Sequence, residues 1–127
     1  MISLLSGNED SVEAVREAIG QKILRTELCE DELLLVFESG LRLALFDEGQ
    51  SCCESRYMRT DDALDSIDGH TLVGIEVADG PETELAGEVQ EVQFLRVTTD
   101  RGLMTISSHN DHNGYYGGIS IRAQKVA

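Results

Sequence analysis

The sequence predicts a single α+β domain of mostly antiparallel β-sheets with an N-terminal helix and one short second helix. Three observations lead to this. The 127 residues are enough for one hydrophobic core and include no repeat or linker. Apolar residues recur at helical spacing near the N-terminus and briefly near residue 64. Elsewhere the apolar pattern has the period of two that is typical of strands.

We expect residues 1–21 to form the helical segment of this domain and residues 22–127 to form its β-rich core. The helix is marked by a capping-box-like pair, an apolar stripe and a terminal glycine, namely Asp10 with Glu13, then Val12, Val15 and Ile19, then Gly20. This stripe needs a partner surface, either the protein's own sheet or another subunit.

Three strands should follow, at Lys22–Leu28, Glu32–Glu38 and Leu41–Asp47, with a tight turn at Ser39-Gly40. Clean alternation in the third strand directs Leu41, Leu43 and Leu45 to the core. The second strand shows no alternation, which is typical of a central strand covered on both sides.

The remaining elements are predicted from turn signals and alternation. Residues Gln50–Thr60 are irregular, and a short helix follows with Thr60 as its N-cap and Asp68-Gly69 at its end. A strand at His70–Ala78 ends at Asp79-Gly80-Pro81, and Glu82–Glu88 is an acidic surface loop. The last part is predicted as strands Glu91–Thr99 and Leu103–Ser108 around a turn at Asp100-Arg101-Gly102, a polar loop from His109 to Gly118, and a strand at Ile119–Ala123.

The net charge of −14 argues against polymeric nucleic acid and against an anionic membrane surface as partners. The acidic residues are unevenly distributed. Of the 24 carboxylates only Asp111 lies after residue 100, where Arg101, Arg122 and Lys125 also occur. A locally neutral or positive pocket can therefore still take a small anion.

The three cysteines, Cys29, Cys52 and Cys53, form no C-x-x-C pair, so a zinc knuckle is not predicted. Their odd number, with no signal peptide and no long apolar run, indicates the reducing cytoplasm. Small core residues are the simplest interpretation of these cysteines.

A first candidate binding segment is Cys52–Thr60, in which Arg56-Tyr57-Met58-Arg59 places two arginines around an aromatic residue in an aromatic-poor chain. A guanidinium group suits phosphate oxygens, and a tyrosine ring suits a base or ribose face. The alternative is that the arginines form ion pairs with Asp61, Asp62 or Asp65.

A second candidate segment lies at residues 109–118 and combines amides, imidazoles, aromatic rings and glycines. Its candidate ligand contacts are Asn110, Asn113, Tyr115, Tyr116 and Gly117. The alternative is a plain hairpin turn at Asn113-Gly114. Two further candidates, Phe94 and Arg122, lie in predicted strands, and Phe94 can also be a core residue.

No catalytic apparatus is recognisable. The best metal candidate is His109 with His112 and Asp111, but its spacing matches no known hydrolase helix. A nucleophilic Cys52 or Cys53 has no orienting pattern, and the glycine-rich loops of nucleotide-binding enzymes are missing from the sequence. We therefore predict a non-enzymatic binding protein without a cofactor or metal.

These segments resemble the Thoeris anti-defence family of phage proteins, of the type that acts as a sponge for immune signals. The resemblance covers about residues 50–122. Its most specific parts are Cys52–Asp62 and His112–Gly118, and it also includes Leu72–Glu76, Asp79-Gly80-Pro81, Gln93-Phe94-Leu95 and Thr99–Gly102.

The resemblance implies a protein of the infected bacterial cytoplasm that sequesters cyclic ADP-ribose isomers intact. It implies dimers that assemble into hexamers, pockets at subunit interfaces and, in some members, separate sites for cyclic di- or trinucleotides. From the matching segments, the resemblance implies that Arg56 and Arg122 contact a pyrophosphate. It also implies that Phe94 and Tyr115 or Tyr116 stack on the ligand, and that the polar side chains of Asn110 and Asn113 recognise it. The alternatives are a metal-dependent enzyme that degrades such signals and an acidic protein–protein inhibitor.

Overall fold

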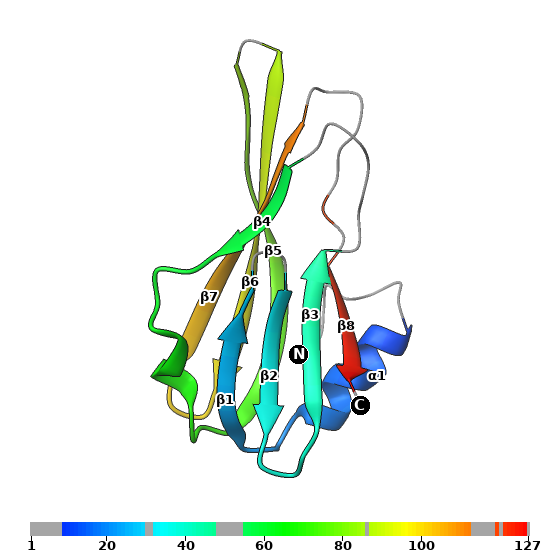
Figure 1. The fold of residues 1–127 in the computed structure, drawn as a ribbon, viewed down its shortest axis with the longest axis vertical. Coiled ribbons are helices and arrows are strands. Elements are labelled where there is room, and N and C mark those ends of the chain that lie inside the picture. Colours follow the sequence, from blue (N-terminus) through cyan, green and yellow to red (C-terminus); the bar gives the residue numbers. More distant parts are fainter. Residues whose placement is uncertain are drawn as a thin grey trace.

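The protein is a sandwich of two four-stranded antiparallel sheets with one α-helix (Figure 1). The computed structural model describes residues 9–29, 32–47, 55–85, 87–112, 119 and 121–126. The elements are α1 (Glu9–Ala18), β1 (Ile23–Leu28), β2 (Glu32–Phe37), β3 (Arg42–Asp47), β4 (Ser55–Arg59), η1 (Leu64–Ile67), β5 (Leu72–Leu85), β6 (Glu88–Thr99), β7 (Leu103–His112) and β8 (Ile121–Val126). The predicted mostly antiparallel β architecture with an N-terminal helix is confirmed.

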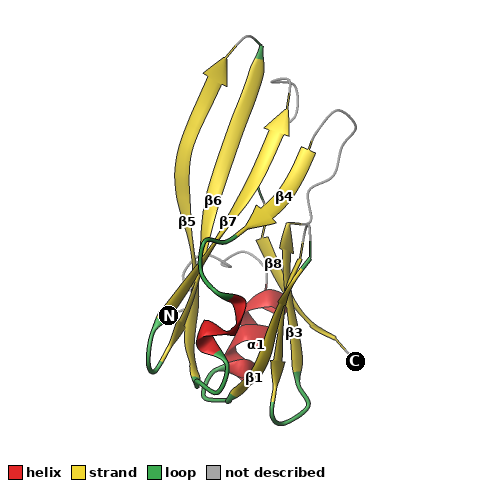
Figure 2. Ribbon diagram, turned by 60° about the vertical axis from the view of Figure 1, so that its left-hand side comes forward, coloured by secondary structure: helices red, strands yellow, loops and turns green. Residues whose placement is uncertain are grey.

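The two sheets differ in length. The short sheet has the order β1-β2-β3-β8, and the long sheet has the order β4-β7-β6-β5. One half of the long sheet extends past the short sheet, as both views show (Figures 1 and 2).

Helix α1 fills the space between the sheets beside β8 (Figure 2). Val15 and Ala18 are fully buried, so the predicted apolar stripe packs against the protein's own sheets. The hydroxyl of buried Ser11 accepts a hydrogen bond from the backbone N–H of Ala123 at 3.0 Å. This contact covers part of the exposed edge of β8, and edge strands commonly need such cover.

The predicted β1–β2–β3 hairpins are present, and β2 is the central strand. Leu43 and Leu45 are fully buried, as the alternation in β3 predicts. The turn closes with a 3.0 Å hydrogen bond from Gly40 N–H to the Phe37 carbonyl, and Gly40 has a φ of 95°. Val36 points away from the core and is 6% exposed, but Leu34 on the same face is only partly buried, so the expected cover on both sides of β2 is found only in part.

The second helix is shorter than predicted, a single 3-10 turn at η1, and Thr60 is not its N-cap. The N-cap residue is Ala63, which makes no side-chain capping bond. Instead, the Thr60 hydroxyl donates to the Thr105 carbonyl at 2.8 Å and accepts from the Asp62 N–H at 3.1 Å. Because η1 begins only at Leu64, Thr60 lies too far from the helix to cap it, and its hydroxyl connects the chain to β7.

The predicted end of the fifth strand at Asp79-Gly80-Pro81 is wrong, as is the predicted surface loop at Glu82–Glu88. Strand β5 continues to Leu85 and forms a long hairpin with β6. The register shifts between Asp79 and Glu82, so a bulge absorbs the Gly-Pro pair. Proline is tolerated there because β5 is an edge strand, where a missing N–H need not break the ladder.

Two segments predicted as irregular are strands, and they pair with each other. Residues Ser55–Arg59 form β4, and β7 continues through His109 to His112. The final strand, predicted at Ile119–Ala123, runs from Ile121 to Val126. Long-range pairing decides these assignments, and local sequence patterns do not report it.

On the inner face of the long sheet, the side chains change from apolar to polar along β7. Leu95 and Ile106 are fully buried and apolar, whereas Ser108 and Asn110, further along β7 on the same face, are polar and at most 1% exposed. Polar side chains therefore replace apolar ones along the inner face of β7 towards its end, although Met58 of β4, opposite Ser108, still packs in the core cluster.

Candidate functional site

Most of the predicted ligand contacts that the structure describes lie in the extended half of the long sheet. On its outer face, which points away from the short sheet, five side chains form what we call the stacked cluster: Tyr57 and Arg59 from β4, and Ser107, His109 and Asp111 from β7. The Tyr57 and His109 rings are parallel within 7° at a centroid distance of 4.8 Å. The Arg59 guanidinium carbon lies 4.9 Å from the Tyr57 ring centroid.

The register of β4 and β7 explains this arrangement. Tyr57 lies directly opposite His109, and Arg59 lies opposite Ser107. Because successive side chains in a strand alternate between faces, these four residues share one face of the sheet. A guanidinium beside an aromatic ring is a cation–π pair.

Hydrogen bonds hold the cluster from both sides. The Tyr57 hydroxyl donates to Asp111 Oδ2 at 3.3 Å. Nε2 of His109 lies 2.8 Å from the Ser107 hydroxyl, which donates to the Arg59 carbonyl at 3.3 Å. The rings are therefore fixed relative to the sheet.

The cluster perturbs the ionisation of both of its rings. Burial, together with the negative charge and hydrogen bond of Asp111, raises the pKa of Tyr57, and Arg59 opposes this. Burial and then the positive charge of Arg59 lower the pKa of His109, while Asp111 opposes them. At neutral pH His109 is uncharged, so Arg59 supplies the positive charge of the cluster.

Phe94 lies on the same outer face, because it pairs directly with Ser107 in the register of β6 and β7. Two strand spacings, about 10 Å, separate its backbone from that of Arg59. Gly80 packs under this ring, since a Cβ built there would lie 2.9 Å from Phe94 Cε2 and 2.6 Å from Val92 Cγ1. Phe94 is half-buried and belongs to the surface of the long sheet, not to the core cluster.

The inner face carries other predicted residues. Met58 is 6% exposed and packs in the core cluster, and Asn110 is fully buried. The backbone of Arg56 lies in register with Asn110, while the Arg56 side chain lies outside the described part. The alternation of β4 therefore separates Tyr57 and Arg59 from Met58.

The alternative prediction, that the arginines form ion pairs with nearby aspartates, concerns Arg59 among the described side chains. Its described contact is with the Tyr57 ring, not with a nearby carboxylate. Asp62 is engaged elsewhere, since its Oδ2 accepts the Thr105 N–H at 2.9 Å.

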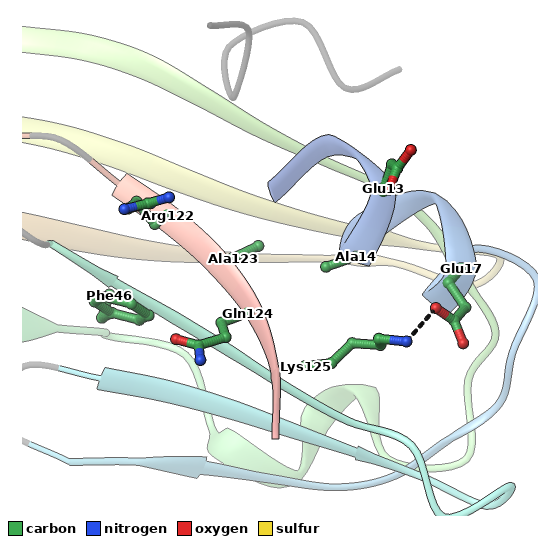
Figure 3. Close-up of a pocket in the computed structure, with 8 residues that line it drawn as sticks. All are labelled: Glu13, Ala14, Glu17, Phe46, Arg122, Ala123, Gln124 and Lys125. Atoms are coloured by element: carbon green, nitrogen blue, oxygen red, sulfur yellow. Dashed lines mark ion pairs between the residues drawn. The ribbon is translucent and has the colours of Figure 1, made fainter. Parts of the chain in front are cut away.

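Arg122 lies apart from the stacked cluster, in the short sheet, where it pairs with Phe46. It lines a cavity of about 550 Å³ between β8 and α1 (Figure 3). The lining residues are Glu13, Ala14, Glu17, Phe46, Arg122, Ala123, Gln124 and Lys125. Lys125 Nζ is 2.9 Å from Glu17 Oε2. This size is within the range of small-molecule pockets, and the lining supplies a guanidinium group, an aromatic ring and an amide.

The structure thus brings together some of the predicted residues and separates others. Tyr57, Arg59 and Phe94 share the outer face of the long sheet, Met58 and Asn110 face inward, and Arg122 is on the other sheet. The remaining predictions, Asn113, Tyr115, Tyr116 and Gly117, lie outside the described residues.

Sequence reasoning missed two parts of these sites. Ser107, His109 and Asp111 alternate in the sequence like a strand face, which was a detectable signal for their grouping with Tyr57. Phe46 and Gln124 line the Arg122 cavity because β3 pairs with β8. No local pattern indicates this pairing between segments about 75 residues apart.

Within the described residues, no helix is long and apolar enough to span a membrane. The same part of the chain contains no group of three or more His, Cys, Asp or Glu side chains suited to a metal ion.

Comparison with curated proteins found no match, and comparison with solved structures also found none. One family model matches, over residues 16–121. That range includes every strand except most of β8, and it contains the whole stacked cluster. The chain therefore belongs to the DUF7448 family, a domain family of unknown function.

Proposed function

We propose that this protein binds a cyclic ADP-ribose-type immune signal and sequesters it intact, as a phage anti-defence sponge in the cytoplasm of an infected bacterium. The observation that carries the proposal is the stack of Arg59, Tyr57 and His109 on a sheet face that also holds Phe94. The sequence resemblance to the Thoeris anti-defence family names the signal class.

The chemistry of the stacked cluster suits a nucleotide. Aromatic rings offer stacking surfaces for a base, and the Arg59 guanidinium suits phosphate oxygens. Arg59 is the cationic group of the cluster, beside the Asp111 carboxylate, in a chain that carries −14 as a whole. Arg122 supplies a second guanidinium group beside the Phe46 ring in the cavity of the short sheet.

The binding free energies expected from the contacts of one protomer favour a site that is shared between protomers. One stacked base contributes roughly 1–3 kcal/mol, and two charge-assisted hydrogen bonds contribute roughly 1.5–3 kcal/mol each. Together these amount to about 4–9 kcal/mol, a dissociation constant from about millimolar to slightly below micromolar. Nanomolar sequestration needs about 12 kcal/mol. We propose that a second protomer supplies the remainder, because the resemblance implies interface pockets and Arg122 lies on the other sheet.

Calorimetry with a panel of cyclic ADP-ribose isomers tests the proposal. We expect one isomer to bind, and both Arg59→Ala and Arg122→Ala to weaken its binding about tenfold or more, the loss of roughly one charge-assisted contact. Arg42→Ala is the matched control, because Arg42 is an exposed arginine of β3 in the short sheet. We expect it to leave the affinity unchanged.

Mass spectrometry of ligand released by heating the loaded protein distinguishes the rival functions. A sponge releases the signal unaltered, whereas a signal-degrading enzyme releases product, and that result would overturn the proposal. Absence of heat with every isomer would also overturn it and would favour an acidic protein–protein inhibitor.

A further inference from the structure

The two arginines of the proposed function lie on opposite outer faces of the sandwich. Arg122 pairs directly with Phe46, and in β8 it follows Ile121 and precedes Ala123, which are both buried. The side chain of Arg122 therefore leaves the short sheet on the side away from the core. Arg59 lies on the outer face of the long sheet, as described above.

In this arrangement one ligand cannot contact both arginines of the same chain. The core cluster includes residues from the inner faces of both sheets, so the thickness of the sandwich separates the two outer faces. The backbones of two packed sheets are about 10 Å apart, and Arg59 and Arg122 extend from them in opposite directions. A single chain therefore offers two half-sites, which are the stacked cluster and the cavity that Arg122 lines.

The two half-sites have complementary charges. The stacked cluster carries both signs, with Arg59 beside the Tyr57 ring and the Asp111 carboxylate bonded to the Tyr57 hydroxyl. The cavity also carries both signs, with Arg122 from β8 and Glu13 from α1 among its lining residues (Figure 3). When two copies meet through these surfaces, each cation can face a carboxylate, in a chain that carries −14 as a whole.

We infer that the signal site is composite, and that the stacked cluster of one copy and the Arg122 cavity of a second copy close over the same ligand. This inference rests on the proposed function and names the partner surface of its site. Because the two half-sites point in opposite directions, the contact is head-to-tail and uses a different surface of each copy. Every chain contributes Arg59 to one site and Arg122 to the next.

Complementation between two variants tests this arrangement. Arg59→Ala and Arg122→Ala should each weaken binding of the cyclic ADP-ribose isomer that wild-type protein binds by about tenfold or more. In an equimolar mixture, a site is intact where an Arg122→Ala chain supplies Arg59 and an Arg59→Ala chain supplies Arg122. Random head-to-tail assembly makes roughly a quarter of the sites intact. Calorimetry of the mixture should therefore recover a high-affinity phase of about that size.

The matched control is a mixture of Arg59→Ala with the double variant Arg59→Ala/Arg122→Ala. Neither chain of this mixture supplies Arg59, so no intact site can form. We expect the high-affinity phase in the first mixture and none in the control. If the first mixture recovers no more binding than the control, the two arginines do not act across copies, and the inference is overturned.

A second measurement uses wild-type protein alone. Native mass spectrometry counts the chains and ligands in the loaded species, and we expect more than one chain, with one ligand for each contact between chains. A loaded single chain as the main species would overturn the inference while leaving sequestration in place. If no cyclic ADP-ribose isomer binds wild-type protein, sequestration itself fails, and the composite site fails with it.

Discussion

Replacing Gly80 with alanine probes the packing that holds Phe94 on the outer face of the long sheet. A Cβ at this position would lie 2.6 Å from Val92 Cγ1, 2.9 Å from Phe94 Cε2 and 2.9 Å from the Val92 carbonyl oxygen. Two of these atoms belong to side chains that can turn, but the carbonyl belongs to a paired backbone. Overpacking of this kind costs about 1–3 kcal/mol. We expect Gly80→Ala to lower the free energy of unfolding by about 2 kcal/mol.

Urea denaturation at 25 °C measures this loss, and Gly102→Ala is the matched control. Gly102 has no heavy atom within 4 Å of a built Cβ and no positive φ. The control should therefore keep or slightly raise stability, since alanine reduces the entropy of the unfolded chain by about 0.4–1 kcal/mol. Equal stability of the two variants would refute the steric argument. We further expect Gly80→Ala to weaken ligand binding, because it displaces the Phe94 ring.

Three further predictions concern the core, the edge of β8 and the dependence on pH. Phe37→Ala should cost about 3–5 kcal/mol in thermal or urea unfolding, since Phe37 is fully buried, whereas exposed Val73→Ala should cost under about 0.5 kcal/mol. Ser11→Ala leaves the buried Ala123 N–H without its acceptor and should cost about 1–3 kcal/mol by urea titration; a neutral result would contradict the role of this contact. Because the folded pKa of His109 is lowered, the unfolded chain binds more protons, so stability falls as pH drops from the usual value of 6.5 toward the folded value. His109→Gln should flatten this fall in melting temperature between pH 7.5 and 5, and an unchanged slope would count against it.

Elements set by local pattern could be predicted from the sequence. The alternation of Leu41, Leu43 and Leu45 and the turn at Ser39-Gly40 depend on neighbours in the chain. Leu43 and Leu45 are fully buried, Leu41 packs partly buried against the core, and the turn is present. Helix α1 is likewise signalled by its own apolar spacing.

Elements set by distant pairing could not be predicted. Strand β4 has no clear alternation of its own and exists because Tyr57 pairs with His109, 52 positions later. A similar limit applies to the candidate site. The sequence indicated Tyr57, Arg59 and Phe94 as a ligand surface, but only strand register shows that Met58 and Asn110 face the opposite way. The position of Arg122 depends on sheet order, which residue spacing does not report.

Because inner-face residues change from apolar to polar along the long sheet, we expect the free energy of local opening to differ between its two halves. Amides of β6 near Leu95 lie over the packed core and should exchange with solvent deuterium only when the whole domain opens. Amides near Gln90 lie beyond that core and should exchange through smaller openings. The half that carries the stacked cluster should therefore change conformation locally when a ligand binds, without unfolding of the whole domain. It should also tolerate substitutions, because the packed core in the other half stabilises the fold.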